Sequence, residues 1–294
     1  MEILGVPSAL LGSQLLVGLI NGSFYAILSL GLAIIFGLLN IINFAHGAQY
    51  MMGAFIAWLA LTKFNVNYWV ALIAAPLLVG LFGVILERTM LRKLYKLDHL
   101  YGLLLTFGLA LIIEGVFRDQ FGISGESYDV PDALAGGINL GFMFLPIYRA
   151  WVIVASLTVC FGTWYMIEKT RLGAYLRAGT ENSQIVQALG INVPLLITFT
   201  YGYGVALAAF AGVLAAPIFQ VNPLMGSNLI IVVFAVVVIG GMGSILGSIV
   251  TGIGLGLIEG LTRVFYPEAS AVVVFVIMVI VLLLRPAGLF GKAA

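Results

Sequence analysis

Charged side chains are scarce in this chain. Asp, Glu, Lys and Arg make up 9% of its 294 residues, whereas hydrophobic residues make up 62%. A soluble domain carries about 25% charged residues, so the polar surface available here is too small to cover a globule in water. The composition therefore predicts an integral membrane protein.

Missing motifs exclude several classes of function. The sequence has no G-x-x-x-x-G-K-[ST] motif, and hence no nucleotide-binding P-loop of its own. Neither histidine has a second histidine or a cysteine nearby that would help to hold a metal. The single cysteine, Cys160, lies in an apolar run and is expected to be a small buried hydrophobe. We expect no catalysis, no cofactor in this chain and no binding of nucleic acid.

Long apolar runs predict an all-α polytopic membrane protein. Crossing the hydrocarbon takes about 20 apolar residues, and the alternating pattern of barrel strands is missing. The first segment lacks a basic leader region and is expected to stay in the membrane. The second and seventh segments are short, so we expect eight or nine crossings with broken or short helices. The expected segments are 10–38, 48–62, 68–90, 102–118, 148–167, 194–217, 228–241, 244–262 and 270–285.

Basic residues predict the orientation. Nine of the 13 Lys and Arg residues fall on one side if the segments alternate, within 88–96, 169–177 and 285–292. The opposite side receives an outer loop, 119–147, which contains acids and no Lys or Arg. Because short cytoplasmic loops collect Lys and Arg, we expect a cytoplasmic C-terminus, an outside N-terminus and a cytoplasmic loop over 168–193. Residues 1–294 are expected to form a single transmembrane domain.

The most informative stretch, 33–54, is a membrane helix interrupted by polar residues. Polar groups and unpaired backbone at membrane depth are tolerated only where protein buries them or water reaches them, and such breaks are typical of transport paths. In the alternative, Asn43 caps the next helix and His46 is hydrogen-bonded inside the bundle. The candidate path residues are Asn40, Asn43, His46, Gly47 and Gln49.

The polar stretch 168–193 contains a predicted short helix. Thr180 is its expected N-cap and Gly190 its expected end. A short helix on the cytoplasmic face suits docking into a groove of a partner protein, and the alternative is an ordinary connecting loop. The candidate docking residues are Thr180, Glu181, Asn182, Ser183, Gln187 and Gly190.

Two membrane acids each precede an arginine by four residues. Glu114 with Arg118 and Glu259 with Arg263 lie in similar Ile-Glu-Gly stretches that are offset by 145 residues. This spacing places both charges on one helix face, and acids at membrane depth are costly unless paired. We therefore expect structural ion pairs, whereas coupling to an ion gradient would need an unpaired acid.

Glycines predict close helix packing. Small residues allow membrane helices to approach closely, and Gly252, Gly254, Gly256 and Gly260 would form one contact face. The cluster 240–243 is expected to unwind the chain between two segments.

With these residues in view, the chain resembles the permease subunits of branched-chain amino-acid ABC importers, of the LivH type. The resemblance covers essentially the whole chain. It is carried by N-I-I-N-F-A-H-G over 40–47, R-A-G-T-E-N-S-Q-I-V-Q-A-L-G-I-N-V-P over 177–194, G-G-M-G-S-I-L-G over 240–247 and R-P-A-G-L-F-G over 285–291.

The resemblance implies a fold and a set of partners. The fold would be that of an ABC importer permease in the bacterial inner membrane, with a second, LivM-like chain completing the pore. Two ATP-binding subunits, which hold ATP and Mg, would dock at a coupling helix near 181–190, and a periplasmic binding protein would deliver the amino acid. Glu181 precedes Gly190 by nine residues, which departs from the E-A-A-x-x-x-G pattern of other importers.

The implied cargo is leucine, isoleucine and valine. The same machinery importing urea, amides or other amino acids is an alternative, because the motifs do not separate these branches. An ion-coupled transporter or a channel is a third reading, from a different class of protein.

Overall fold

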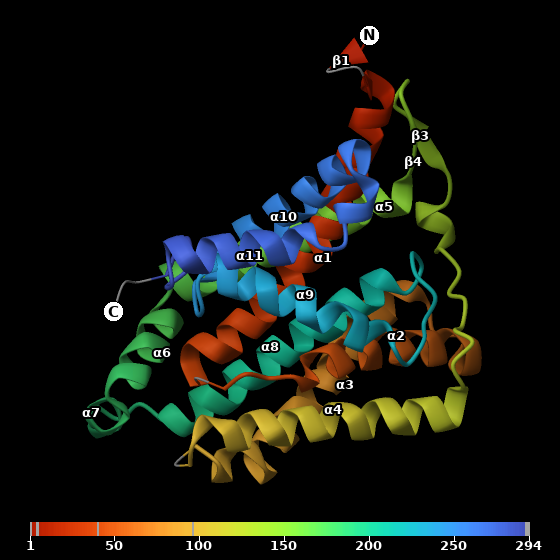
Figure 1. The fold of residues 1–294 in the computed structure, drawn as a ribbon. Helices are drawn as coiled ribbons and strands as arrows, with labels where there is room; N and C mark the ends of the chain where they lie inside the picture. Colours follow the sequence, from red (N-terminus) through yellow and green to blue (C-terminus); the bar gives the residue numbers. More distant parts are fainter. Residues whose placement is uncertain (1, 4–5, 40, 96, 292–294) are drawn as a thin grey trace.

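The protein is built almost entirely of helices (Figure 1). The computed structural model describes residues 2–3, 6–39, 41–95 and 97–291. Two short antiparallel strand pairs lie outside the helices, β1 (Glu2–Ile3) with β2 (Val6–Pro7) and β3 (Gly137–Asn139) with β4 (Phe144–Pro146). The helices are α1 (Ser8–Leu39), α2 (Ala45–Phe64), α3 (Tyr68–Thr89), α4 (His99–Phe121), α5 (Ile147–Lys169), α6 (Arg171–Glu181), α7 (Ser183–Ala188), α8 (Val193–Ala215), α9 (Met225–Gly240), α10 (Ile245–Phe265) and α11 (Val273–Leu284), with the 3-10 turns η1 (Leu91–Lys93), η2 (Asp132–Leu134) and η3 (Pro267–Ala269).

In the described part of the chain, six helices are long and apolar enough to cross a bilayer. They are α1, α3, α4, α5, α8 and α10. The predicted segments 48–62, 228–241 and 270–285 correspond to α2, with 20 residues, α9, with 16, and α11, with 12. Length and composition thus give fewer spanning helices than the eight or nine predicted, because α9 and α11 are short and α2 begins with polar residues.

Glycines hold α1 and α10 together. Gly18 and Gly22 of α1 lie directly against Gly256 of α10, so that a Cβ at Gly256 would overlap the α1 backbone. Gly252 and Gly260 belong to the same contact, as predicted for this face. Gly254 does not, because a Cβ there would meet no atom within 4 Å. The close approach gives these two helices extensive van der Waals contact, which is what drives helix association in lipid.

Helix α8 forms the second packing centre. A Cβ at Gly53 of α2 would overlap the Ala209 carbonyl, and one at Gly212 of α8 would overlap the Tyr50 carbonyl. Helix α2 therefore rests backbone to backbone on α8. Cys160 of α5 is fully buried, as predicted.

Helix α4 lies at the edge of the bundle, along the lower side of Figure 1. Only 11% of its apolar 18-residue stretch is buried, against 83% for α1. Most of one helix of spanning length is thus left uncovered in the single chain.

The loops gather at two opposite ends. At one end, Gly12 near the start of α1 lies against the Phe142 ring of the loop 119–147, and Glu126 of this loop pairs with Val221. At the other end lie α6, α7 and the residues after α11 (Figure 1). The loop before α5 and the short helices after it thus lie at opposite ends of the bundle (Figure 1).

Residues 285–291 fold back onto the end of α9, and we call them the C-terminal turn. The backbone N–H of Leu289 donates to the Ile239 carbonyl at 2.8 Å, and that of Phe290 to the Gly240 carbonyl at 3.1 Å. Gly241 and Gly288, with φ of +100° and +82°, lie backbone to backbone. The last carbonyls of α9, which would otherwise lack partners, are capped in this way.

Candidate functional site

The helix break lies between α1 and α2. Helix α1 ends at Leu39, residues 41–43 are irregular, and α2 begins at Ala45. Asn40, a predicted path residue, lies outside the described residues. His46, Gly47 and Gln49 fall inside the first turns of α2 instead of the break, so the interruption is shorter than 40–49. The reason is local: the Asn43 carbonyl accepts the His46 N–H at 3.2 Å, which starts the helix immediately.

The start of α2 lies at the level of the middle of α1. His46 Nε2 is 3.0 Å from the carbonyl oxygen of Leu28. Leu28 precedes Leu39, the end of α1, by 11 residues, or about 16 Å at 1.5 Å per residue. Residues 41–44 therefore run back beside α1 before α2 begins (Figure 1). Non-helical backbone thus occurs deep within the bundle, where protein has to supply its partners.

Three polar side chains at the break and in the first turns of α2 are fully buried, namely Asn43, His46 and Gln49. The Asn43 amide nitrogen donates to Gln49 Oε1 at 3.1 Å, so its side chain does not cap α2. Among the described residues, Asn43 Oδ1 and His46 Nδ1 have no hydrogen-bond partner, and Gln49 Nε2 and the Tyr201 hydroxyl lie beside each other without a hydrogen bond of standard geometry. A buried polar group left unpaired costs about 1–3 kcal/mol. Such a concentration is unusual in a packed core.

Tyr201 of α8 was missed from the sequence. It is fully buried, and its hydroxyl lies beside the Gln49 side chain without a hydrogen bond of standard geometry. Its stretch, Tyr201-Gly202-Tyr203-Gly204, reads as ordinary small-and-aromatic membrane packing. Nothing local separates Tyr201 from Tyr203, whose hydroxyl lies 2.6 Å from Thr163 Oγ1.

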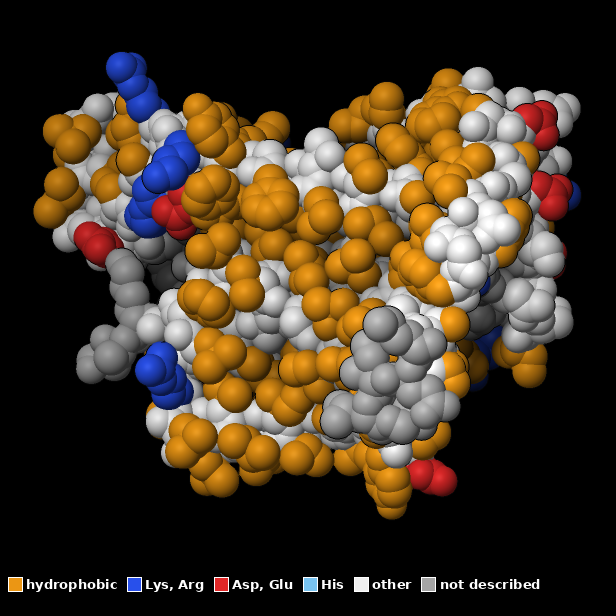
Figure 2. Space-filling model, turned by 90° about the horizontal axis from the view of Figure 1, so that it is seen from above, with side chains coloured by type: hydrophobic (Ala, Val, Ile, Leu, Met, Phe, Trp, Pro, Cys, Tyr) orange, Lys and Arg blue, Asp and Glu red, His pale blue; other side chains and the backbone are white. Residues whose placement is uncertain are grey.

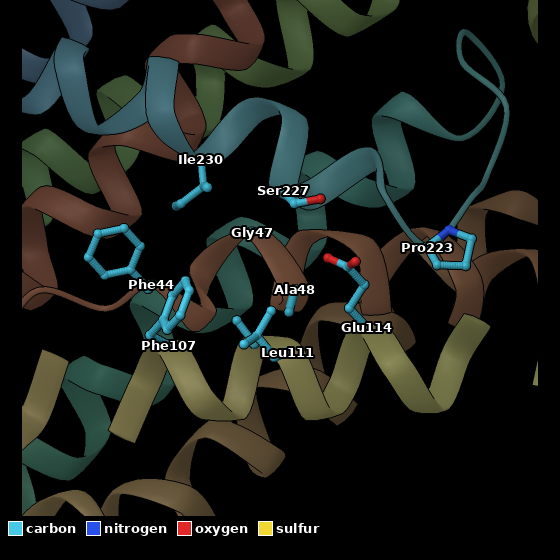
Figure 3. A pocket seen from close by; sticks show the side chains of 10 residues that line it. Phe44, Gly47, Ala48, Phe107, Leu111, Glu114, Pro223, Ser227 and Ile230 are labelled. Carbon is cyan, nitrogen blue, oxygen red and sulfur yellow. The ribbon is translucent and has the colours of Figure 1, made fainter. Parts of the chain in front are cut away.

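A pocket of about 70 Å³ lies beside the break, between α2, α4 and the start of α9 (Figure 3). This volume holds about two water molecules, so the pocket is closed to an amino acid in this conformation. Glu114 is the one charged residue among those that line it. The lining residues are Phe44, Gly47, Ala48, Phe107, Ala110, Leu111, Glu114, Pro223, Ser227 and Ile230.

The beginnings of α2 and α9 touch at the wall of this pocket. Gly47 and Gly226 are in backbone contact, and a Cβ on either would overlap the other residue. The starts of two helices, each with partial positive charge from its free N–H groups, therefore lie side by side. Glycine at both positions is what permits this approach.

The structure places both predicted Glu–Arg pairs in contact. Arg118 Nη2 lies 2.7 Å from Glu114 Oε1 on α4. On α10, Arg263 contacts Glu259, which also accepts a hydrogen bond of 2.8 Å from the Tyr25 hydroxyl of α1. The first pair borders the pocket, and the second joins two packed helices.

One buried acid was missed by sequence reasoning. Glu87 of α3 is 1% exposed and accepts hydrogen bonds from Tyr95, at 2.7 Å, and Thr198, at 2.6 Å. Because it directly precedes Arg88 near a helix end, its sequence context suggests a solvated carboxylate. Its hydroxyl partners come from the loop before α4 and from α8, and spacing alone does not reveal them.

The cytoplasmic stretch forms two short helices, α6 and α7. Thr180 lies in the last turn of α6 and donates to the Arg177 carbonyl, so it is not the predicted N-cap. Asn182 caps α7 instead, accepting from the Ile185 N–H at 3.1 Å. Gly190, with φ of +85°, follows the end of α7 near the predicted position.

The tip of α7 exposes both polar and apolar groups. All six predicted docking residues are exposed, Thr180, Glu181, Asn182, Ser183, Gln187 and Gly190. Two apolar side chains beside them, which sequence reasoning passed over, are more informative. Ile185 is 60% exposed and Leu189 75% exposed, and their i,i+4 spacing puts them on one face.

Among the described residues, no group of three or more His, Cys, Asp or Glu side chains is placed to hold a metal ion.

Comparisons with a family model and with related sequences agree on one family. The family model described as "Branched-chain amino acid transport system / permease component" matches residues 14–282. The high-affinity branched-chain amino acid transport system permease protein BraD of Pseudomonas aeruginosa is 32% identical, with 95% of each chain covered. The corresponding protein LivH of Escherichia coli is 28% identical, also with 95% of each covered. Among solved structures, PsaBC from Streptococcus pneumoniae in complex with Fab has a TM-score of 0.47 at 13% identity, covering 90% of this chain and 89% of that one.

Proposed function

The chain belongs to the family of branched-chain amino-acid transport permeases, and from this membership we propose that it forms half of the path of an ATP-driven importer for leucine, isoleucine and valine. Its relatives are permease subunits of transporters, not enzymes. One structural observation carries the proposal: α2 begins at the level of the middle of α1, beside buried unpaired polar groups and a small pocket. A broken helix at this depth is typical of a transport path.

The break residues Asn40, Asn43, His46, Gly47 and Gln49 hold this path open or line it. Asn43, His46 and Gln49 each have a side-chain donor or acceptor without a standard hydrogen bond. These groups can form hydrogen bonds in a rearranged state. The cargo is a zwitterion with an apolar side chain, for which small apolar walls and a few amides provide weak, transient contact. High affinity belongs to the binding protein that delivers it.

Alternating access requires the pocket to widen. In the described conformation it has room for about two water molecules, and the Gly47–Gly226 contact closes one wall. Of the six helices of spanning length, α4 has the smallest buried share. Separation of α4 from α2 and α9 is therefore the movement that enlarges the pocket with the smallest loss of packing.

We place the chain in the bacterial inner membrane with eight or nine crossings. The described helices α2, α9 and α11 complete this number, with α2 and the break before it acting as one crossing. Lys and Arg lie mainly at the margin that carries α6 and α7, left in both views, while hydrophobic side chains cover the middle (Figure 2). By the preference of cytoplasmic loops for positive charge, that end and the C-terminus face the cytoplasm and the start of α1 faces the periplasm.

The partners are a second permease chain of the LivM type, two ATP-binding subunits and a periplasmic binding protein. This chain holds no cofactor, and ATP and Mg²⁺ belong to the ATP-binding subunits. Helix α7 enters a groove of one such subunit, with Ile185 and Leu189 as its apolar contacts and Glu181, Ser183 and Gln187 at the rim. Exposed apolar side chains flanked by polar ones are typical of such interfaces.

The test is reconstitution. We expect the chain to co-purify with two ATP-binding subunits and a second permease, and the complex in proteoliposomes to take up leucine only with ATP and the loaded binding protein. Competition by isoleucine and valine, but not by urea or amides, identifies the cargo. Uptake by the chain alone, without ATP, would contradict the proposal.

Variants of α7 test the coupling site. We expect Ile185→Glu together with Leu189→Glu, or Glu181→Lys, to lower recovery of the ATP-binding subunits while the permease remains folded. Arg171→Glu, at the start of α6, is the matched control and should leave recovery unchanged. Normal recovery in all variants would remove α7 from the interface.

A further inference from the structure

The outer loop 119–147 is joined to the segment between α8 and α9 by an antiparallel bridge. The backbone N–H of Glu126 donates to the Val221 carbonyl at 2.8 Å, and that of Val221 donates to the Glu126 carbonyl at 2.8 Å. The Val221 side chain is fully buried. We call this pair of residues the outer latch, and the two segments that it joins lie side by side at the right of Figure 1.

On one side, the latch is closely attached to the end of α4. Helix α4 ends at Phe121, and four residues, 122–125, lead from there to Glu126. Gly122 and Gly125, at the two ends of this link, have φ of +73° and +78°. Glycine adopts this backbone conformation without steric cost, which allows the chain to turn sharply. The link between α4 and the latch is therefore a short turned segment.

On its other side, the latch leads directly into α9. Asn222 follows Val221, its Oδ1 accepts from the Leu224 N–H at 3.0 Å, and its carbonyl accepts from the Met225 N–H at 3.2 Å. Pro223 inside this turn has a fixed φ, which stiffens the turn further. Because α9 begins at Met225, a displacement of Val221 is carried to the first turn of α9.

The latch thus connects two walls of the pocket beside the helix break. Leu111 and Glu114 of α4 line one wall, and Pro223 and Ser227 line another (Figure 3). These walls have to part if the pocket is to admit an amino acid, and the latch joins them at the end of α4 that carries the outer loop. Two backbone hydrogen bonds and one buried side chain are few enough contacts to open and close locally in a folded protein.

We propose that the outer latch is the gate of the path on the periplasmic side. While Glu126 and Val221 are paired, the end of α4 and the start of α9 stay together and the pocket keeps its small volume. When they part, the start of α9 moves away from α4 and the pocket opens toward the delivered amino acid. The inference rests on the proposed function and adds to it the contact that has to break.

A disulfide across the latch tests this inference. Directly opposite residues that exchange both hydrogen bonds have Cα atoms about 5.5 Å apart, which suits a disulfide, and Cys160 is buried. The variant is Glu126→Cys with Val221→Cys, in the assembled transporter in proteoliposomes. We expect oxidation to abolish ATP-driven leucine uptake in proportion to the cross-linked fraction, and dithiothreitol to restore it.

The matched control is Ile138→Cys with Leu145→Cys. These two residues also lie opposite each other in an antiparallel pair, between β3 and β4 of the same loop. Their disulfide does not join α4 to α9, so uptake should stay normal when this pair is cross-linked. Full uptake by the cross-linked latch would overturn the inference.

A second measurement needs a single substitution. Because the Val221 side chain is fully buried, Val221→Cys should react slowly with a membrane-impermeant maleimide at rest. During ATP turnover with the loaded binding protein we expect at least roughly fivefold faster reaction, since a buried thiol becomes reactive only when it is exposed. Equal rates in the two conditions would overturn the inference. Absence of ATP-dependent uptake in the unmodified complex would instead contradict the proposed function.

Discussion

The two Glu–Arg pairs of this chain have the same spacing and opposite surroundings. Glu259 on α10 is buried and is held by Arg263 and by the Tyr25 hydroxyl of α1. Glu114 on α4 has Arg118 as its one ion-pair or hydrogen-bond partner among the described residues, and it borders a pocket on an uncovered face. The first pair fastens two helices, whereas the second is available to a partner or a ligand.

The helices around the pairs explain the difference. Gly256 and Gly260 bring the α10 backbone against α1, which places Tyr25 within reach of Glu259. On α4, a Cβ at Gly108 or Gly115 would meet no atom within 4 Å. The role of such a pair is therefore decided by what the neighbouring helix presents, and the i,i+4 spacing only ensures that the two charges meet.

The largest effect is expected from Gly256→Ala. Its Cβ would overlap the α1 backbone, so the helices have to separate, and we expect a loss of about 3 kcal/mol, the upper end for overpacking. Gly115→Ala is the matched control and should be neutral or stabilising by up to about 1 kcal/mol. Thermal unfolding in detergent can be followed with a thiol-reactive dye, because Cys160 becomes reactive only when the bundle opens. Equal melting temperatures for both variants would contradict the packing comparison.

Glu259→Gln should destabilise by about 2 kcal/mol. The value is below the roughly 3–5 kcal/mol for breaking a fully buried pair, because the Arg263 side chain is 40% exposed. Glu114→Gln should cost less than about 1 kcal/mol, as for exposed pairs. The same dye measurement compares them. A larger loss for Glu114→Gln would reverse the roles given to the two pairs.

A comparison of thiol reactivity tests whether water reaches the faces of α3 and α4 equally. We expect Leu111→Cys, at the pocket, to react with a membrane-impermeant charged thiol reagent at least about tenfold faster than Leu77→Cys on α3, since the reactive thiolate needs water. Both positions are strongly exposed in the single chain, so exposure alone predicts equal rates. Equal rates in the assembled transporter would place both faces in the same surroundings.

The smallest effect is expected from Tyr25→Phe. It removes one hydrogen bond to Glu259 and keeps the ring, so the loss should be about 1–2 kcal/mol. Tyr101→Phe, an exposed tyrosine on α4, is the control without a measurable change. If Tyr25→Phe also leaves the stability unchanged, the Tyr25 hydroxyl does not help to hold Glu259, and the two pairs are more alike than the geometry indicates.

Local chemistry made much of the fold predictable. Hydrophobic run length gave the six spanning helices, and Asn192 with Pro194 marked the start of α8, where Asn192 Oδ1 accepts from the Leu195 N–H at 3.1 Å. The glycine face on α10 followed from spacing. By contrast, the prediction of Thr180 as the N-cap was wrong. Residues 171–181 already form a helix, so Asn182 is the cap of the next one.

The parts that sequence did not reveal depend on contacts between distant elements. Tyr201 and Glu87 are buried by residues from distant parts of the chain, and Glu87 accepts a hydrogen bond from Thr198 of α8. Glu114 was found, but the pocket beside it comes from α2 and α9, more than 60 residues away on either side. Spacing identifies residues that share a helix face, whereas a site at a helix break depends on how three helices meet.

The C-terminal turn has a consequence for biogenesis. The α9 carbonyls of Ile239 and Gly240 receive their partners from Leu289 and Phe290, which the ribosome makes after every membrane helix described here. The corner between α9 and α10 can therefore close only after all of these helices have been made, and a chain stopped before residue 289 leaves the end of α9 uncapped.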